Sequence, residues 1–189
     1  RPVPRSSPVM LASPTPVVLV HGGAGTVAPE LHAAVVEGTH AAASAGQAVL
    51  RDGGTCEDAA VAAVRVLEDA PAFTAGRGAC MNRDGQFEHD AGIMRSRDLR
   101  SGAVAGVPAV RDAIAVARLV LEQTHHCLLT GPGAVALARA HGVGKFGYDE
   151  VWTAKAAAVY AAVQAGHLHA DNRADTVGAV VLDRDGNFC

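Results

Sequence analysis

The apolar and polar residues of the first fifty positions follow two patterns in succession. A β-branched run at 16–25, "PVVLVHGGAG", ends in glycines and predicts a buried strand that leads into a tight loop. From 29 to 51 the chain is Ala-rich, with apolar residues three and four positions apart, which predicts a helix. The "DGG" at 52–54 ends this helix.

The middle of the chain is predicted to hold a second helix and then strands. Thr55, with Asp58 three residues later, has the pattern of a capping box, and the helix that it begins runs to Pro71. Strand-like segments follow at 79–94 and 101–110, and the first is folded back at the hairpin signal "NRDGQ".

The last third alternates again between helices and short strands. A third helix is expected over 112–123, and "HHCLLTG" at 125–131 reads as a brief buried strand. "PGAVALARAHG" predicts a further helix, and 148–165 predicts an amphipathic one. A polar stretch then leads to a strand that begins at Thr176, and "DRDGN" marks a second hairpin turn.

These elements predict an α+β fold of one domain. Hairpin-linked strands and separate helical blocks favour an antiparallel sheet with helices packed outside it, not a βαβ pattern. Residues 1–16 contain five Pro, which together with Ser interrupt the apolar segment that a signal peptide needs, so we expect a disordered tail there. A hairpin at a chain end needs further strands to pair with, so we expect the protein to continue beyond Cys189.

Composition narrows the function classes. The formal net charge of -3, with Lys and Arg scattered, leaves no basic stripe for a nucleic acid. No apolar run approaches the ~20 residues that span a bilayer, so no membrane partner is expected. The four cysteines form no CxxC pair and are expected to be reduced, mostly buried thiols of a cytoplasmic protein; they are Cys56, Cys80, Cys127 and Cys189.

Two motifs with candidate chemistry have simpler structural interpretations. "HGGAG" at 21–25 lacks the Lys-Ser/Thr of a P-loop, which leaves a tight turn or a backbone scaffold beside an active site. The pairs His125-His126 and His167/His169 lack a third ligand at metal-binding spacing, so a metalloenzyme is not supported.

Carboxylates and one threonine offer other chemistry. Glu88 and Asp90 would share one face of a strand, as an acid–base pair does, although ion-paired residues near a sheet edge are the favoured interpretation.

Thr176 stands where a polar segment meets a strand. A threonine hydroxyl becomes a good nucleophile when its own α-amine serves as base, which requires cleavage of the preceding bond. Spacing alone would leave Thr176 an ordinary strand residue.

Taken together, the motifs resemble the plant-type (type III) L-asparaginase and isoaspartyl peptidase family of N-terminal nucleophile (Ntn) hydrolases. The similarity is carried, in order, by "VVLVHGGAGT", "VLEDAPAFTAGRGACMNRDGQFEHDAGIM", "SGAVAGV", "ARLVLEQTHHCLLTGPGA" and "DTVGAVVLDRDGN". It implies an αββα four-layer sandwich, present here incompletely as the α-region, 17–175, and the start of the β-region, 176–189.

The resemblance also implies a reaction. Thr176 would attack the Asp175 carbonyl, the resulting ester would be hydrolysed, and the freed Thr176 would hydrolyse L-asparagine or isoaspartyl dipeptides, with Gly22 and Gly23 lying against the cleavage site. The family has no catalytic cofactor. It has a structural sodium ion held by main-chain carbonyls, which by position would be those of Leu67, Glu68, Ala70, Phe73, Ala75 and Arg77.

Departures from the family pattern set the alternatives. Thr74 stands where the family usually has Asn, and Arg95 where an acid is common. The family's second catalytic Thr, substrate-binding residues and oxyanion hole would lie beyond Cys189, so the fragment alone is expected to be inactive. Glycosylasparaginase-like and taspase-like hydrolases and an inactive truncated member are the alternatives. The full-length form is expected to be an (αβ)₂ homodimer that takes a small-molecule or dipeptide substrate.

Overall fold

The computed structural model describes residues 14–108, 110–166 and 176–189, so most of the predicted tail, 1–16, lies outside it. The strands are β1 (Val17–His21), β2 (Glu88–Met94), β3 (Ser101–Pro108), β4 (Leu128–Thr130) and β5 (Gly178–Leu182). The α-helices are α1 (His32–Arg51), α2 (Cys56–Asp69), α3 (Ala113–Gln123), α4 (Gly131–Ala140), α5 (Tyr148–Val151) and α6 (Ala154–Gln164). Two short 3₁₀ turns are η1 (Pro29–Leu31) and η2 (Gly76–Gly78).

The described strands form two small sheets, β1–β5 and β2–β3–β4. β1 is antiparallel to β5, and β2 is antiparallel to β3. The prediction of an antiparallel sheet is wrong at β4, which runs parallel to β3. The reason is that α3 connects β3 to β4 as a crossover, and a crossover returns the chain in the same direction.

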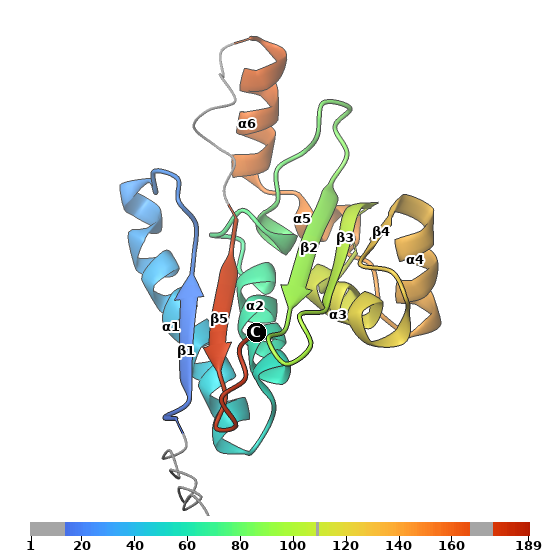
Figure 1. Cartoon of the computed structure of the whole chain (residues 1–189). Coiled ribbons are helices and arrows are strands. Elements are labelled where there is room, and N and C mark those ends of the chain that lie inside the picture. The colour runs from blue at the N-terminus through green and yellow to red at the C-terminus, as the bar shows by residue number, and fades with distance from the viewer. Residues whose placement is uncertain (1–13, 109, 167–175) are drawn as a thin grey trace, which may run out of the picture.

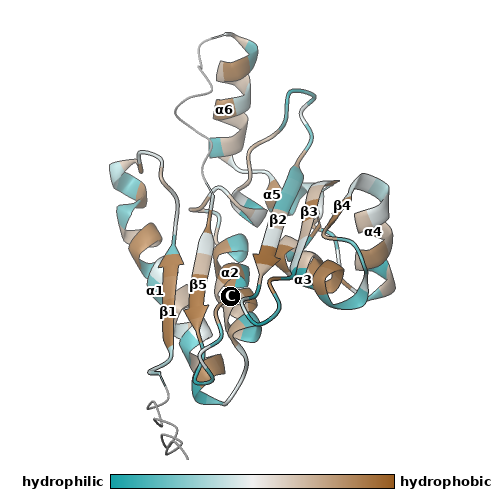
Figure 2. Cartoon of the chain, in the orientation of Figure 1, coloured by the Kyte–Doolittle hydropathy of each residue, from teal (hydrophilic) through white to brown (hydrophobic). Residues whose placement is uncertain are grey.

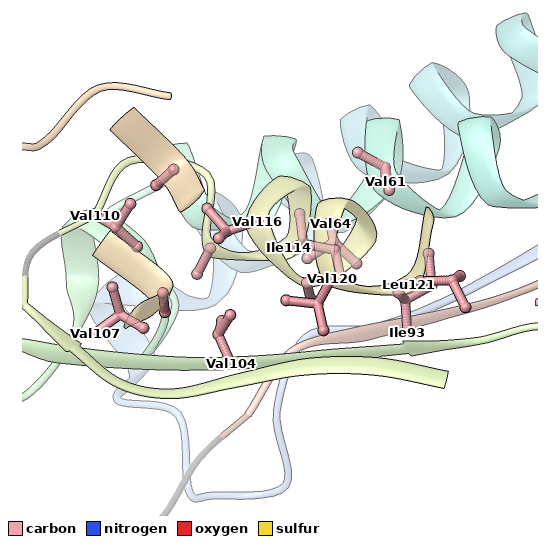
Figure 3. Close-up of a cluster of buried hydrophobic side chains, with 14 residues drawn as sticks. Val61, Val64, Ile93, Val104, Val107, Val110, Ile114, Val116, Val120 and Leu121 are labelled. Carbon is pink, nitrogen blue, oxygen red and sulfur yellow. The ribbon is translucent and has the colours of Figure 1, made fainter. Parts of the chain in front are cut away.

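Helices α1, α2 and α3 lie behind the strands in Figure 1, where α1 packs on β1, α2 on β5 and α3 on β2 and β3. The largest buried cluster fills the space between α2, α3 and the second sheet (Figure 3). Its labelled members are Val61, Val64, Ile93, Val104, Val107, Val110, Ile114, Val116, Val120 and Leu121. Most of these side chains are small and β-branched, which suits close packing of helix on sheet.

The prediction that β1 is a buried strand is wrong for one of its faces. Val18 and Val20 are partly buried and pack against clusters of buried residues. Val17 and Leu19 alternate with them and are 49% and 64% exposed. Figure 2 shows the apolar strands β1 and β5 facing the viewer without a helix over them. The ribbon therefore has one packed face and one open apolar face.

The helix predicted over 148–165 is divided in two. The backbone is extended at Trp152 and Thr153, between α5 and α6. Thr153 explains the break, because its side chain accepts a hydrogen bond from the Ala156 N–H and so serves as the N-cap of a new helix. Within α6 only Ala156 is fully buried, so the amphipathic character expected there is wrong as well.

The hairpin predicted within 79–94 is shorter than expected. Its turn forms, with Asn82 Oδ1 accepting hydrogen bonds from the N–H groups of Asp84 and Gln86. Only one bridge, between Met81 and Phe87, joins its arms in the described chain. The regular strand β2 begins after this bridge.

The described chain ends beside β5. Val181 and Cys189 exchange two backbone hydrogen bonds, of 2.9 and 3.0 Å, and the Ser96 N–H donates to the Phe188 carbonyl at 2.8 Å. Phe188 and Cys189 therefore lie between β5 and the end of β2, where Figure 1 marks the C-terminus. None of the described helices is long and apolar enough to cross a membrane.

Candidate active site

A cavity of about 810 Å³ lies between β5 and β2, the two strands that border the gap between the sheets. The floor comes from α2 and α3, with Ala60, Val64 and Ile114. Polar residues at its wall include Thr176, Thr74, Glu68, Glu88, His89 and Asp90. The threonine that the sequence singled out thus borders this cavity.

Thr176 is exposed and lies two residues before the start of β5. Asp175, the other residue of the expected cleavage site, lies outside the described residues. The β1–β5 register ends with His21 opposite Gly178. Gly22 and Gly23 therefore leave β1 at the same end of the ribbon at which the Thr176 segment enters β5.

Gly22 makes close contact with the loop that follows α2. A Cβ atom on Gly22 would lie 2.8 Å from both the Phe73 ring and the Thr39 methyl group. Gly23 has a φ of 122°, which side-chain-bearing residues rarely adopt. The glycine loop is thus shaped by packing and backbone geometry. It does not line the cavity in the described chain.

The loop from Ala70 to Ala79 is tightly folded and lines the cavity with Thr74, Ala75 and Gly76. A Cβ on Gly76 would lie 2.1 Å from the Glu68 carbonyl oxygen, and one on Gly78 would lie 1.8 Å from that of Phe73. Only glycine allows the backbone to come so close. The carbonyls of Glu68 and Phe73, two of the six expected sodium ligands, are thus packed against the glycines of this loop.

Thr74, where the family usually has Asn, has a partner that the sequence did not predict. Lys155 Nζ, in the first turn of α6, donates a hydrogen bond to Thr74 Oγ1 at 3.1 Å. Both residues are half-buried. Sequence reasoning missed Lys155 because the two residues are 81 positions apart and no local pattern links them.

Glu68 and His89 are buried polar residues at the cavity wall, 5% exposed each. Burial raises the pKa of Glu68 to about 8, although its Oε1 accepts a hydrogen bond from the Ile114 N–H. Burial likewise lowers the pKa of His89. Its Nδ1 lies 2.9 Å from the Val110 carbonyl oxygen, which can only accept, so Nδ1 carries the proton. At neutral pH the wall here presents an uncharged imidazole.

Arg95, the second departure from the family pattern, belongs to a charge cluster around the buried Glu57. Its guanidinium makes two hydrogen bonds to Asp98, of 2.9 and 2.7 Å. It also lies 3.7 Å from Glu57 Oε1, which Arg97 contacts at 2.6 Å. Glu57 is 1% exposed, so two arginines compensate an otherwise unpaired buried charge. This cluster fixes the end of β2 against the start of α2.

Glu88 and Asp90 take structural roles, though not as the expected ion pairs. Glu88 Oε2 accepts from the Asn82 side chain at 2.9 Å, and Asp90 Oδ1 accepts from the Gly106 N–H at 2.7 Å. The β2–β3 register shifts between His89 and Ala91, which marks a bulge at Asp90.

The remaining candidates within the described residues contribute no further chemistry. The four cysteines are free, as predicted, but only Cys56 is fully buried and Cys127 is exposed, so the expectation of mostly buried thiols is wrong. Burial raises the pKa of the Cys56 and Cys189 thiols, which are therefore protonated and unreactive. Within the described residues no three His, Cys, Asp or Glu side chains gather as metal ligands. His167 and His169 lie outside that part of the chain.

Comparison with known proteins defines the class of this chain. Residues 14–189 match the family model described as asparaginase, so the chain belongs to the asparaginase family. It is 41% identical over 177 residues to the human isoaspartyl peptidase/L-asparaginase and 40% identical to that of Macaca fascicularis. It is also 46% identical over 130 residues to the plant-type L-asparaginase of Pyrococcus horikoshii.

The matches differ in the share of each protein that they cover. The human and macaque alignments cover 91% of this chain and 58% of the relative, and the Pyrococcus alignment covers 68% and 42%. The chain thus spans little more than half the length of the mammalian relatives that it matches.

Proposed function

We propose that this chain is the α-region and first β-hairpin of an autoprocessing threonine amidohydrolase that hydrolyses L-asparagine, isoaspartyl dipeptides or both. The observation that carries the proposal is the position of Thr176 at the cavity wall, two residues before β5, within a chain matched to the asparaginase family over residues 14–189. The names of the mammalian relatives supply the two substrate classes.

The first reaction is cleavage of the chain itself. Thr176 Oγ attacks the carbonyl carbon of Asp175, its hydroxyl proton passes to the departing Thr176 nitrogen, and an ester replaces the peptide bond. Water then hydrolyses the ester, which leaves a carboxylate on Asp175 and a free α-amine on Thr176. An α-amine has an ordinary pKa of about 7.7–8.0, so its neutral form is available as a base near neutral pH.

The second reaction uses the new N-terminus on substrate. The amine accepts the Thr176 hydroxyl proton while Oγ attacks the side-chain amide of asparagine, and ammonia leaves after receiving that proton. The β-aspartyl ester that remains is hydrolysed by water to aspartate. An isoaspartyl dipeptide follows the same path, with the second amino acid as the leaving amine.

Autocleavage of the full-length gene product is the test. Wild-type protein should give two bands on a denaturing gel, one fragment should begin Thr-Val-Gly, and asparagine should release ammonia. Thr176→Ala should remain one band without activity, whereas Thr176→Ser, which keeps a hydroxyl, should still be cleaved. Wild-type protein that stays intact and releases no ammonia would contradict the proposal.

The finer fold, an αββα sandwich, is part of the proposal. The open face of the β1–β5 ribbon supports it, because Val17, Leu19 and Val180 are about half exposed or more there. A second sheet, supplied by a β-region that begins at Thr176, would bury these side chains. In this reading 17–175 is the α-subunit, 176–189 begins the β-subunit, and the mature protein is an (αβ)₂ dimer.

A structural sodium ion is proposed for the loop after α2. The glycines at 76 and 78 let backbone oxygens crowd together, and carbonyl oxygens suit a hard cation. The carbonyls would be those of Leu67, Glu68, Ala70, Phe73, Ala75 and Arg77, so the ion would stabilise the cavity wall that carries Thr74.

The free cysteines agree with a cytoplasmic location, which is proposed on that ground.

A further inference from the structure

Lys155 is a half-buried cation next to the cavity wall. Its ammonium donates to Thr74 Oγ1 at 3.1 Å, and the ion pairs among the described residues do not include it. It also occupies the first turn of α6, where the positive end of the helix dipole disfavours a cation. Neither an ion pair with an acidic side chain nor the dipole of α6 therefore explains the position of the Lys155 ammonium. The contact that remains is the hydrogen bond to Thr74.

Thr74 is held firmly at the cavity wall. It follows Phe73, which is 1% exposed, and the loop around it is fixed by the close backbone packing of Gly76 and Gly78. Tyr160 lies over Gly85, and Gln164 donates to the Arg83 carbonyl at 3.0 Å, so α6 is also anchored to the neighbouring hairpin turn. The Lys155–Thr74 hydrogen bond thus links α6 to the loop after α2.

The donor and acceptor roles of Lys155 and Thr74 determine what the Thr74 hydroxyl can donate to. A lysine ammonium can only donate, so Thr74 Oγ1 is the acceptor and its own proton remains free for another acceptor. A hydroxyl whose oxygen accepts from a cation is a stronger donor than a free one. Thr74 and Thr176 line the same cavity, so a group that reacts at Thr176 is within the cavity that this proton faces.

We propose that Lys155 is a positioning residue that acts through Thr74, orienting the Thr74 hydroxyl so that its proton donates into the cavity at the Thr176 end. The inference rests on the proposed function, because it assigns the pair to the reaction of Thr176. One member of the pair, Thr74, stands where the family usually has Asn.

The test is steady-state asparagine hydrolysis by the full-length protein and its variants. Thr74→Val should lower kcat about 10²-fold, the effect of losing one donor at a reacting centre. Lys155→Met should lower kcat about tenfold, because the hydroxyl remains but loses its orientation. KM should stay unchanged for both. Thr74→Ser and Lys155→Arg should restore most of the rate, and the double variant Thr74→Val/Lys155→Met should be no slower than Thr74→Val.

Lys145→Met is the matched control, since Lys145 is the only other lysine of the chain and is exposed. It should leave kcat unchanged. A wild-type rate in Lys155→Met, multiplying effects in the double variant, or a loss that added sodium chloride reverses would each overturn the assignment. Inactivity of the wild-type protein would instead overturn the proposed function, and this assignment with it.

Discussion

The side chain of Asp183 stabilises the hairpin turn after β5, and this hairpin positions the end of the described chain. It is 4% exposed, and its carboxylate accepts from the N–H groups of Asp185 and Asn187 at 3.0 and 2.9 Å. It also accepts from the Cys56 N–H, at the start of α2, at 3.4 Å. The turn after β5 and the first turn of α2 are therefore joined through a single carboxylate.

We expect Asp183→Ala to lower the free energy of unfolding by about 2–3 kcal/mol, because it leaves the buried Cys56 N–H and the partly buried N–H groups of Asp185 and Asn187 without this acceptor. Urea denaturation of wild-type and variant protein measures the difference. Asp185→Ala, which changes an exposed carboxylate two residues away, should change stability by less than about 0.5 kcal/mol. Equal losses in the two variants would show that the hydrogen bonds of Asp183 contribute little.

The same residue predicts a pH dependence. Burial alone would raise the pKa of Asp183, but the hydrogen bonds from Asn187, Asp185 and Cys56 outweigh it and hold the pKa below its usual 3.8. A depressed pKa means that the stabilisation is complete above that value and is lost as pH falls through the lower, folded-state pKa. Asp183→Asn should therefore lack the part of the acid-induced loss of stability that wild-type protein shows below about pH 4.

Local residue chemistry was the part of the structure that the sequence predicted best. The capping box at Thr55 and Asp58 is present as predicted, because both partners lie within four residues and need no tertiary context. The environment of Arg95 could not be predicted in the same way. Its partner Glu57 is 38 positions earlier in the chain, and only the tertiary fold brings the two together.

At the level of elements, the loop after α2 carries the clearest test of a bound ion. If sodium is held by its carbonyls, the free energy of unfolding should rise with sodium concentration by RT ln(1 + [Na⁺]/Kd), about 2.7 kcal/mol at one hundred times Kd. Thermal unfolding in sodium chloride and in choline chloride at equal ionic strength measures this. Equal melting temperatures in the two salts would contradict the sodium site.

The predicted element boundaries were correct where the apolar periodicity was long and wrong where it was interrupted. Helices α1, α2 and α3 lie where predicted, since each repeats its apolar positions over three or more turns. The segment 148–165 also has helical composition throughout, but Thr153 caps a new helix and divides it. A cap within a helical pattern competes with continuation of that helix, and composition does not decide between them.

At the scale of the molecule, the sequence predicted the α+β class but not how the strands are shared between sheets. The parallel pairing of β3 with β4 depends on where α3 packs, and the open face of β1 depends on what lies across from it. Both are tertiary facts. The cavity at Thr176 arises in the same way, because β5 and β2 border a space that neither closes on its own.

The space between β5 and β2 has room for one additional strand. Cys189 and Phe188 already begin it, bonded to Val181 on one side and to Ser96 on the other. Continued, the strand would run antiparallel to both β5 and β2 and would join the two sheets into one. Backbone groups alternate along a strand, so Gly92 and Met94 share with Ser96 the edge of β2 that faces the space. Ala179 shares with Val181 the corresponding edge of β5.

Amide hydrogen exchange tests this arrangement in a protein that continues beyond Cys189. The amides of Gly92, Met94 and Ala179 should exchange much more slowly there than in the 189-residue chain, because each gains a hydrogen-bond acceptor. Arg95 is an internal control, since its N–H already bonds to the Arg100 carbonyl at 3.1 Å on the β3 side, and its exchange should change less. If Gly92 and Met94 remain as unprotected in the longer protein as in the chain, no strand fills the space, and the cavity beside Thr176 is closed by some other element.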